Sequence, residues 1–197
     1  MSNVIDLRSR VEPKLIRGAW TDEEFRTRLL ENPTAAYSSV MQEAGGELPT
    51  GTEVKALAEE PKKLYLVIPA GDVPDDLEVE VDERSSRGEF EASIILRAKR
   101  DEKFKEQLLA DAKGTYEGLM GELREGASLP EELEIEALEE TGNVIYFRLP
   151  QTPEGISDEL TDEELEQAAG GKQAAVVAAC VAASTVCVGV AVAVALL

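Results

Sequence analysis

The sequence contains no histidine and only two cysteines among its 197 residues. Without histidine, the chain lacks the side chain that most often acts as a general base near neutral pH and most often binds transition metals. Cys180 and Cys187 alone can form neither a disulfide framework nor a four-ligand zinc site. We therefore expect no catalytic residue, no metal and no cofactor in this chain.

Basic residues are also scarce, with 20 lysines and arginines against 40 aspartates and glutamates. Residues 1–171 hold all 40 acidic residues and 19 of the basic ones, which gives this part a formal charge of −21. Binding to nucleic acids or to anionic membranes needs clustered lysine and arginine, so we expect neither partner. A basic partner fits this charge better, and solubility alone also accounts for it.

A secretion signal is missing as well, because the first ten residues, MSNVIDLRSR, contain no apolar core. We therefore expect the chain to start in the cytoplasm. Apolar residues gather instead in residues 172–197, which contain nine alanines, eight valines and two leucines, with Lys172 as the only charged residue. Both cysteines and the adjacent Ser184 and Thr185 lie in this apolar tail. The contrast with the charged body indicates two different roles joined at one point.

Two parts of the body, residues 20–69 and 99–150, repeat one pattern. Equivalent residues are 79 positions apart at first, and 81 apart after a two-residue insertion. A register held across the whole unit indicates internal duplication. The equivalent pairs are Phe25/Phe104, Leu29/Leu108, Leu30/Leu109, Tyr37/Tyr116, Met41/Met120, Pro49/Pro130, Val54/Ile135, Leu57/Leu138, Tyr65/Tyr146 and Pro69/Pro150.

Each copy is predicted to form two helices followed by a β-hairpin. Thr21 and Glu24 have the spacing of a capping box, Asn32-Pro33 separates the two helices, and Gly45-Gly46 ends the second one. In the second copy Lys99-Arg100 replaces Trp20-Thr21, which predicts a weaker cap there. The predicted strands are 52–58, 64–68, 133–138 and 144–149.

Two features of the body leave less defined expectations. The segment between the copies could supply a strand at 77–81 or act as an acidic linker. Adjacent acidic pairs such as Glu23-Glu24 and Glu139-Glu140 are expected to be solvated surface rather than acid–base catalysts.

Residues 157–171 predict a short helix that ends at a double glycine. Thr161 is its N-cap, Glu164 closes a capping box, and Leu160 and Leu165 flank the helix start as a hydrophobic staple. An ordinary surface helix has the same pattern, but the apolar tail that follows favours a protease site. A narrow protease cleft admits glycines next to the bond it cuts, and a helix before them offers a docking element.

In total, the sequence predicts an α+β fold with a duplicated helix–helix–β-hairpin unit, a short helix and an unstructured apolar C-terminal segment. Three motifs in it resemble one known family: DEEF-x-x-x-LLENP at 22–33, EALEETGNVIYFRLP at 136–150 and ELTDEELEQAAGG at 159–171. In these motifs, and over nearly all of residues 15–171, the chain resembles the nitrile hydratase-like leader family. Its members are proteusin-type precursors of ribosomally synthesised, post-translationally modified peptides, and they usually have one leader copy rather than two.

The resemblance implies three parts: a first leader unit plus linker at 1–92, a second leader unit with the cleavage helix at 93–171, and a core peptide at 172–197. Such leaders recruit tailoring enzymes, and a papain-like peptidase fused to an exporter cuts after the second glycine. Here this places cleavage between Gly171 and Lys172, followed by secretion of the core peptide. The second unit adjoins the cleavage helix, so we expect the enzymes to bind that copy. The residues assigned to cleavage and recognition are Gly170, Gly171, Lys172, Leu160, Thr161, Glu164, Leu165 and Ala168.

The resemblance reaches nitrile hydratase itself, a metalloenzyme whose metal is bound by three cysteines in a C-x-x-C-S-C run. Cys180 and Cys187 are too far apart to form such a run, and a third sulfur is missing. We therefore expect no hydratase activity.

The tail carries two hydroxyl residues and two thiols, a matched set for thioether rings. Dehydration of Ser184 and Thr185 would give two alkenes, to which the thiolates of Cys180 and Cys187 can add. A single disulfide and two free thiols are the alternatives, and the ring topology is open. This chemistry predicts a lanthionine-containing, bacteriocin-like peptide made by a lanthionine synthetase or another tailoring enzyme.

The Val/Ala pattern of the tail also resembles proteusin cores modified by radical epimerases, which adds such an epimerase to the candidate partners. Because the tail is so apolar, the released peptide is expected to be membrane-active.

Two other classes of protein compete with the precursor interpretation. Residues 174–197 form 24 uncharged positions, enough for a tail anchor that spans a bilayer with about 20 residues. Against an anchor stand the preference for alanine and valine, the lack of interfacial aromatic residues and the acidic flank. A soluble partner-binding module with a disordered tail is the third possibility, although such tails are normally polar.

Overall fold

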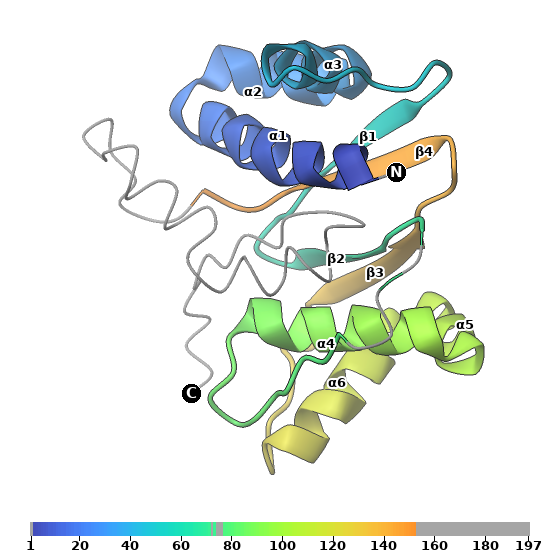
Figure 1. The fold of residues 1–197 in the computed structure, drawn as a ribbon. Coiled ribbons are helices and arrows are strands. Elements are labelled where there is room, and N and C mark those ends of the chain that lie inside the picture. The colour runs from blue at the N-terminus through green and yellow to red at the C-terminus, as the bar shows by residue number, and fades with distance from the viewer. Residues whose placement is uncertain (1, 72, 74–76, 153–197) are drawn as a thin grey trace.

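The computed structural model describes residues 2–71, 73 and 77–152 (Figure 1). These residues form an α+β fold, which confirms the predicted class. The predicted short helix before the double glycine and the apolar tail lie outside the described residues. The elements are α1 (Ser2–Thr21), α2 (Glu23–Glu31), α3 (Pro33–Glu43), β1 (Glu53–Ala58), β2 (Lys63–Ile68), α4 (Arg87–Arg100), α5 (Glu102–Ala110), α6 (Ala112–Leu123), β3 (Glu134–Glu139) and β4 (Val144–Leu149).

The duplication is confirmed, since α2, α3, β1 and β2 recur as α5, α6, β3 and β4. The repeated unit is larger than predicted, because α1 and α4 precede the two copies in equivalent positions. The segment between the copies forms no strand at 77–81, and its second part belongs to α4. The equivalent pairs added by these helices are Arg8/Arg87, Glu12/Glu91, Leu15/Ile94, Ile16/Ile95, Ala19/Ala98 and Asp22/Asp101.

The strands pair between the copies, so the predicted hairpin pairing is wrong. β1 and β2 are joined by a tight turn in which the backbone groups of Glu60 and Lys63 hydrogen-bond each other. Beyond this turn the strands separate. β1 runs parallel to β4, with Glu53 opposite Val144, and β2 runs parallel to β3, with Lys63 opposite Glu134. Each two-stranded sheet therefore contains one strand from each copy.

The helices cover the paired sheets from opposite sides. Figure 1 shows α1, α2 and α3 over the sheet of β1 and β4, and α4, α5 and α6 over the sheet of β2 and β3. The core under α1–α3 contains Val54 from the first copy together with Phe147 and Leu149 from the second. The core under α4–α6 likewise contains Leu66 and Ile68 from the first copy. Each set of helices thus buries strand residues that come from the other copy. This burial favours strand pairing between the copies over a hairpin within one copy.

The helix boundaries follow from short polar caps. Asp22, not Thr21, is the N-cap of α2, and its Oδ1 accepts a hydrogen bond from the backbone N–H of Phe25 at 2.9 Å. Thr21 is the last residue of α1, and its hydroxyl donates to the carbonyl of Arg17. The predicted capping box is therefore wrong, because a second acceptor residue directly follows the threonine.

The remaining helix ends agree with the predictions except in the second copy. Asn32 caps α3 with Pro33 as its first residue, and Gly45 follows the end of α3 with a positive φ of 82°. The cap of α5 is as well formed as that of α2, because Asp101 accepts hydrogen bonds from the N–H groups of Lys103 and Phe104. The weaker cap predicted for this copy is wrong.

Candidate functional site

The described residues contain two buried clusters of charged side chains, related by the duplication. The first ionic cluster consists of Arg8, Glu12, Tyr37 and Glu140. The second ionic cluster consists of Glu59, Arg87, Glu91 and Arg148. Arg8, Glu12 and Glu140 correspond to Arg87, Glu91 and Glu59, so each cluster joins the helix that precedes one copy to the strand turn of the other copy.

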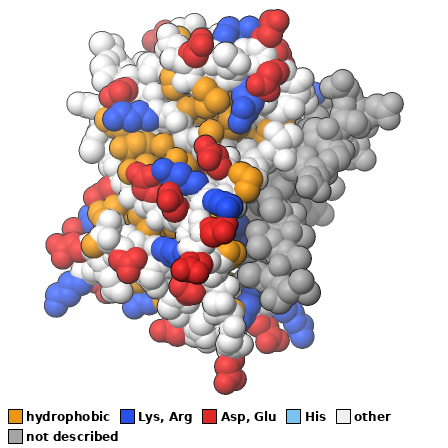
Figure 2. All heavy atoms as spheres, turned by 180° about the vertical axis from the view of Figure 1, so that it is seen from behind, with side chains coloured by type: hydrophobic (Ala, Val, Ile, Leu, Met, Phe, Trp, Pro, Cys, Tyr) orange, Lys and Arg blue, Asp and Glu red, His pale blue; other side chains and the backbone are white. Residues whose placement is uncertain are grey.

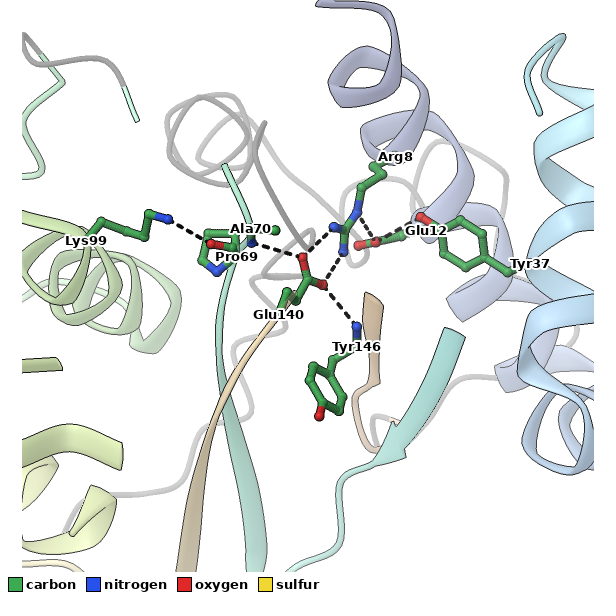
Figure 3. Close-up of polar contacts among 8 residues, drawn as sticks. All are labelled: Arg8, Glu12, Tyr37, Pro69, Ala70, Lys99, Glu140 and Tyr146. Carbon is green, nitrogen blue, oxygen red and sulfur yellow. Dashed lines mark hydrogen bonds and ion pairs between the residues drawn. The ribbon is translucent and has the colours of Figure 1, made fainter. Parts of the chain in front are cut away.

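In the first ionic cluster, Glu140 is the central acceptor (Figure 3). The guanidinium of Arg8 donates to both of its carboxylate oxygens, at 3.0 and 3.1 Å. The backbone N–H groups of Ala70 and Tyr146 donate to the same carboxylate, at 3.3 and 3.0 Å. Glu140 is 5% exposed, so this carboxylate is buried with its lone pairs satisfied.

The other side of Arg8 binds Glu12. Its Nε donates to Glu12 Oε1 at 2.9 Å, and the hydroxyl of Tyr37 donates to the same oxygen at 3.1 Å. Burial disfavours the charged form of Arg8, but the carboxylates of Glu12 and Glu140 outweigh it and raise the pKa of Arg8. Burial, together with the nearby Glu12 carboxylate, also raises the pKa of Tyr37. The phenol therefore keeps its proton and acts as a donor.

The second ionic cluster contains one more arginine. Arg148 Nη1 lies 2.7 Å from Glu91 Oε2 and 3.4 Å from Glu59 Oε1, and Arg87 contacts both carboxylates. The residue equivalent to Arg148 in the first copy is Val67, so the two clusters have diverged here. Burial alone would raise the pKa of Glu91, but Arg87 and Arg148 hold this pKa below its ordinary value.

These clusters have the features of structural ion pairs that hold the two copies together, and not those of a catalytic site. Each buried carboxylate accepts hydrogen bonds from arginine, so none presents the unsatisfied oxygen that a general base would aim at a substrate. The adjacent pair Glu139-Glu140 was expected to be solvated surface, and this expectation is wrong for Glu140. Glu139 is partly exposed and binds Lys105 at 2.8 Å, whereas Glu140 is buried against Arg8.

A third link between the copies also occurs twice, with different chemistry. Trp20 Nε1 donates to the carbonyl of Pro150 at 3.1 Å. At the equivalent position, Lys99 Nζ donates to the carbonyl of Pro69 at 2.9 Å. Both residues thus connect the end of a long helix to the end of a strand from the other copy.

Two of the hollows on the described surface lie in non-equivalent places of the two copies. One is a cavity of about 380 Å³ between α4, α6, the chain before β3 and the turn that joins β1 to β2. The other is a groove of about 620 Å³ beside α1, α2 and α3. Gly18 and Phe25 both line this groove, and a Cβ at Gly18 would lie 2.8 Å from the ring of Phe25, so their close contact requires glycine. At the equivalent place in the second copy, the guanidinium of Arg97 lies over the ring of Phe104, 4.3 Å from its centroid.

On the face shown in Figure 2, acidic and basic side chains are mixed and apolar groups lie between them. Within residues 2–71, 73 and 77–152, no group of three or more metal-ligating side chains comes together. No helix in the same ranges is both long and apolar enough to span a bilayer.

The residues that the sequence assigns to recognition, cleavage and modification all follow Thr152. They lie outside the described residues and stay predictions. They are Leu160, Thr161, Glu164, Leu165, Ala168, Gly170, Gly171, Lys172, Cys180, Ser184, Thr185 and Cys187.

Sequence reasoning missed both ionic clusters and the helices that carry half of their residues. A usable signal was present, because the register of 79 residues continues backwards from Phe25/Phe104 to Arg8/Arg87. An Arg-x-x-x-Glu pattern recurs in that register among apolar residues. It would have indicated a helix before each copy, with an arginine and a glutamate paired on one face.

No protein-family model matches the chain. Among curated proteins, it is similar to Polytheonamide B of a bacterial symbiont, subspecies Theonella swinhoei (strain pTSMAC1). The two are 37% identical over 99 residues, which cover 50% of this chain and 68% of the relative.

Among solved structures, the chain is similar to two double mutants of the Fe-type nitrile hydratase of Comamonas testosteroni Ni1. Both comparisons give a TM-score of 0.52, at 17% and 18% identity. They cover 81% and 80% of this chain, and 67% and 66% of the hydratase chains. At this level of identity the likeness concerns the fold alone, so it assigns no hydratase chemistry.

Proposed function

Because this chain belongs to the nitrile hydratase-like leader family of proteusin-type peptide precursors, we propose that residues 1–171 are a leader and residues 172–197 the core peptide. In this proposal the leader binds tailoring enzymes and holds the core peptide close to them. The chain is then a substrate of enzymes and has no catalytic role of its own.

The similarity to Polytheonamide B carries the proposal, because the matched residues cover two thirds of that relative. The composition of the chain supports it further. A charged, folded body is followed by a tail of alanine and valine that contains the chain's only cysteines. The charge of the body would also keep this apolar tail soluble until it is released.

Cleavage is proposed between Gly171 and Lys172. Neither Gly170 nor Gly171 has a side chain, so both can enter a narrow cleft next to the scissile bond. The preceding segment offers Leu160, Leu165 and Ala168 as apolar contacts. We propose a papain-like peptidase domain of an exporter as the enzyme, so that release of the core peptide is coupled to its secretion from the cytoplasm.

The proposed modification forms thioether rings between Ser184 or Thr185 and the two cysteines. Loss of one water from each hydroxyl residue leaves an alkene between the α- and β-carbons. The thiolate of Cys180 or Cys187 then forms a bond to the β-carbon, and a proton is added at the α-carbon. Each ring therefore lowers the mass by one water and removes one free thiol. A lanthionine synthetase is the proposed enzyme, and a radical epimerase would act on the same apolar run. The product would be a membrane-active, bacteriocin-like peptide.

Intact and tandem mass spectrometry tests this function on the chain co-expressed with its native tailoring and export enzymes. We expect a released fragment that begins at Lys172, is lighter by one or two waters, and has thiols that do not react with an alkylating reagent. The variant Gly171→Val should block release while leaving the ring masses on the full chain. Its matched control, Gly46→Val, alters the other double glycine and should leave release unchanged.

The ring chemistry has its own control. Cys187→Ala should leave the fragment with one ring fewer but still released at Lys172. A fragment released with both thiols reactive and no loss of water would contradict the rings while supporting cleavage. A full-length, unmodified chain in the membrane fraction would contradict the precursor function and favour a tail anchor.

A further inference from the structure

One side of α3 lines the groove of about 620 Å³ beside α1, α2 and α3. The α3 residues in the groove recur every three or four positions, so they lie on the same side of the helix. They are Ala35, Ala36, Ser39, Val40 and Glu43. In Figure 1, α2 and α3 lie on the outer side of α1, away from the strands. The groove is therefore part of the outermost layer of the first copy.

The groove has a floor of core residues and a rim that contains small, exposed ones. Val40 is 9% exposed and belongs to the core under α1–α3, and Phe25 and Ala36 pack against this core. Ala35 and Ser39 are exposed. The core beneath the groove is complete without a partner, and the small side chains above it leave room for a second helix to approach closely.

The charged residues of the groove balance one another. Lys14 and Arg28 supply two positive charges, Glu31 and Glu43 supply two negative ones, and all four are exposed. Arg28 forms a solvent-exposed pair with Glu24 at 3.9 Å. Within residues 2–71, 73 and 77–152, the other three side chains have no ion pair or hydrogen bond. Equal numbers of both signs favour neither a strongly acidic nor a strongly basic partner, but they are complementary to a second copy of the same patch.

The layer that carries the groove is also nearly neutral. Residues 2–46 contain six basic and seven acidic residues, a charge of −1, so residues 47–197 account for −19 of the formal charge of −20. At physiological ionic strength, exposed charges more than about 8 Å apart are largely screened. Two chains can therefore approach through this layer without the repulsion expected from their total charge.

The second copy differs at the equivalent place. Gly18 corresponds to Arg97, whose guanidinium lies over the ring of Phe104, 4.3 Å from its centroid. Phe104 is 6% exposed, whereas Phe25 is only partly buried and lines the groove. A helix that approached the second copy there would meet the side chain of Arg97. We therefore expect association through the first copy.

We propose that this groove joins two copies of the chain in a two-fold symmetric dimer, with their α3 helices antiparallel and Ser39 at the axis. Ala35 of one copy then lies opposite Glu43 of the other, because each is four residues from Ser39. Arg28, in the last turn of α2, precedes the start of α3, so its guanidinium can pair with Glu43 of the second copy. Two-fold symmetry makes each of these contacts twice.

The dimer is expected to be weak. The central element of the interface, α3, has 11 residues, which places the buried area at the low end for specific interfaces. We expect a Kd on the order of 100 µM. Sedimentation equilibrium of the full chain, over about 5 to 500 µM, should then show an average mass that rises from monomer towards dimer.

A matched pair of variants locates the interface. Ser39→Glu places two like charges beside each other at the axis and should raise the Kd about tenfold or more. Gly118→Glu places the same charge at the equivalent exposed position of α6, where a side chain would meet open space. This control should leave the Kd unchanged.

An exchange of charges tests the antiparallel orientation. Arg28→Glu and Glu43→Arg should each raise the Kd about tenfold, because each brings like charges together across the interface. The double variant restores opposite charges and should return the Kd to within about threefold of the original value. These variants decide the matter if circular dichroism shows that Ser39→Glu does not fold.

Two results would overturn the dimer. One is a chain that stays monomeric up to about 500 µM. The other is association that neither Ser39→Glu nor the exchange of charges alters, which would mean that another part of the chain, such as the apolar tail, joins the molecules. Either result leaves the precursor function intact, because the dimer requires no tailoring or export enzyme.

Discussion

At the scale of single residues, Glu139 and Glu140 show how environment separates two identical side chains. They are neighbours in the sequence, but alternation along β3 and the turn after it sends them to different partners. Glu139 remains near solvent beside Lys105, and Glu140 is enclosed with Arg8 and two backbone N–H groups. A sequence pattern cannot distinguish them, because Arg8 is 132 residues away from Glu140.

Replacement of these two residues should have unequal effects on stability. Glu140→Ala leaves a buried arginine and two buried N–H groups without their acceptor, and should lower the free energy of unfolding by about 3–5 kcal/mol. Glu139→Ala removes a partly exposed ion pair and should cost less than about 1 kcal/mol. Urea unfolding followed by circular dichroism measures both. Equal losses would contradict the structural role of the first ionic cluster.

Glu91 makes stability depend on pH in the acidic range. Its pKa is lower in the folded chain than in the unfolded one, since Arg87 and Arg148 stabilise the carboxylate against the cost of burial. Such a group stabilises the fold above its unfolded pKa of about 4.3, and this contribution is lost as the pH falls through the lower, folded value.

The comparison with Glu91→Gln isolates this contribution from the general loss of acidic repulsion. At pH 7 the original chain should be more stable than the variant. The difference should shrink below about pH 4.3. Urea unfolding at several pH values measures it, and a difference that stays constant down to pH 3 would exclude Glu91 as the source.

At the scale of elements, most of the structure of each copy could be predicted from local patterns. The helix break at Asn32-Pro33 and all four strands lie within about one residue of their predicted places, because caps, proline and alternation act locally. Strand pairing was not predictable in this way. β1 and β3 have the same alternation, so either could pair with β2 or β4 as far as the pattern shows.

The helix junctions provide a test at this scale. Asp22 both ends α1 and caps α2, whereas Thr21 lies within α1. Asp22→Ala should lower the free energy of unfolding by about 1 kcal/mol because the N–H of Phe25 loses its acceptor. Thr21→Ala should change it by less than about 0.5 kcal/mol. Thermal unfolding of both variants would show which residue is the cap, and a larger loss for Thr21→Ala would restore the sequence-based assignment.

At the scale of the whole molecule, the two copies form one body because each core uses strands from both. Phe147 completes the core under α1–α3, and Ile68 completes the core under α4–α6. The duplication was evident from the sequence, but this exchange was not, because it depends on contacts between segments about 70 to 90 residues apart. For the candidate site, the sequence pointed only to residues beyond Thr152.

Cutting the chain between the copies should not separate them. A protease site inserted after Gly71, between β2 and α4, would allow cleavage of the folded chain. We expect the two fragments to elute together in size-exclusion chromatography and to separate only in denaturant, since both sheets and both ionic clusters join them. Fragments that elute separately in native buffer would contradict the exchanged pairing.

The exchanged strands also determine when the protein can fold during its synthesis. When the ribosome has made α1, α2, α3 and β1, their apolar faces still lack Phe147 and Leu149, which complete the core. About 90 residues must still be translated, which takes roughly 5–20 s. During that time the apolar faces of the first copy's helices have no β4 residues to pack against. The core under α4–α6 has all its strand residues once β3 is made, whereas the core under α1–α3 closes last, with β4.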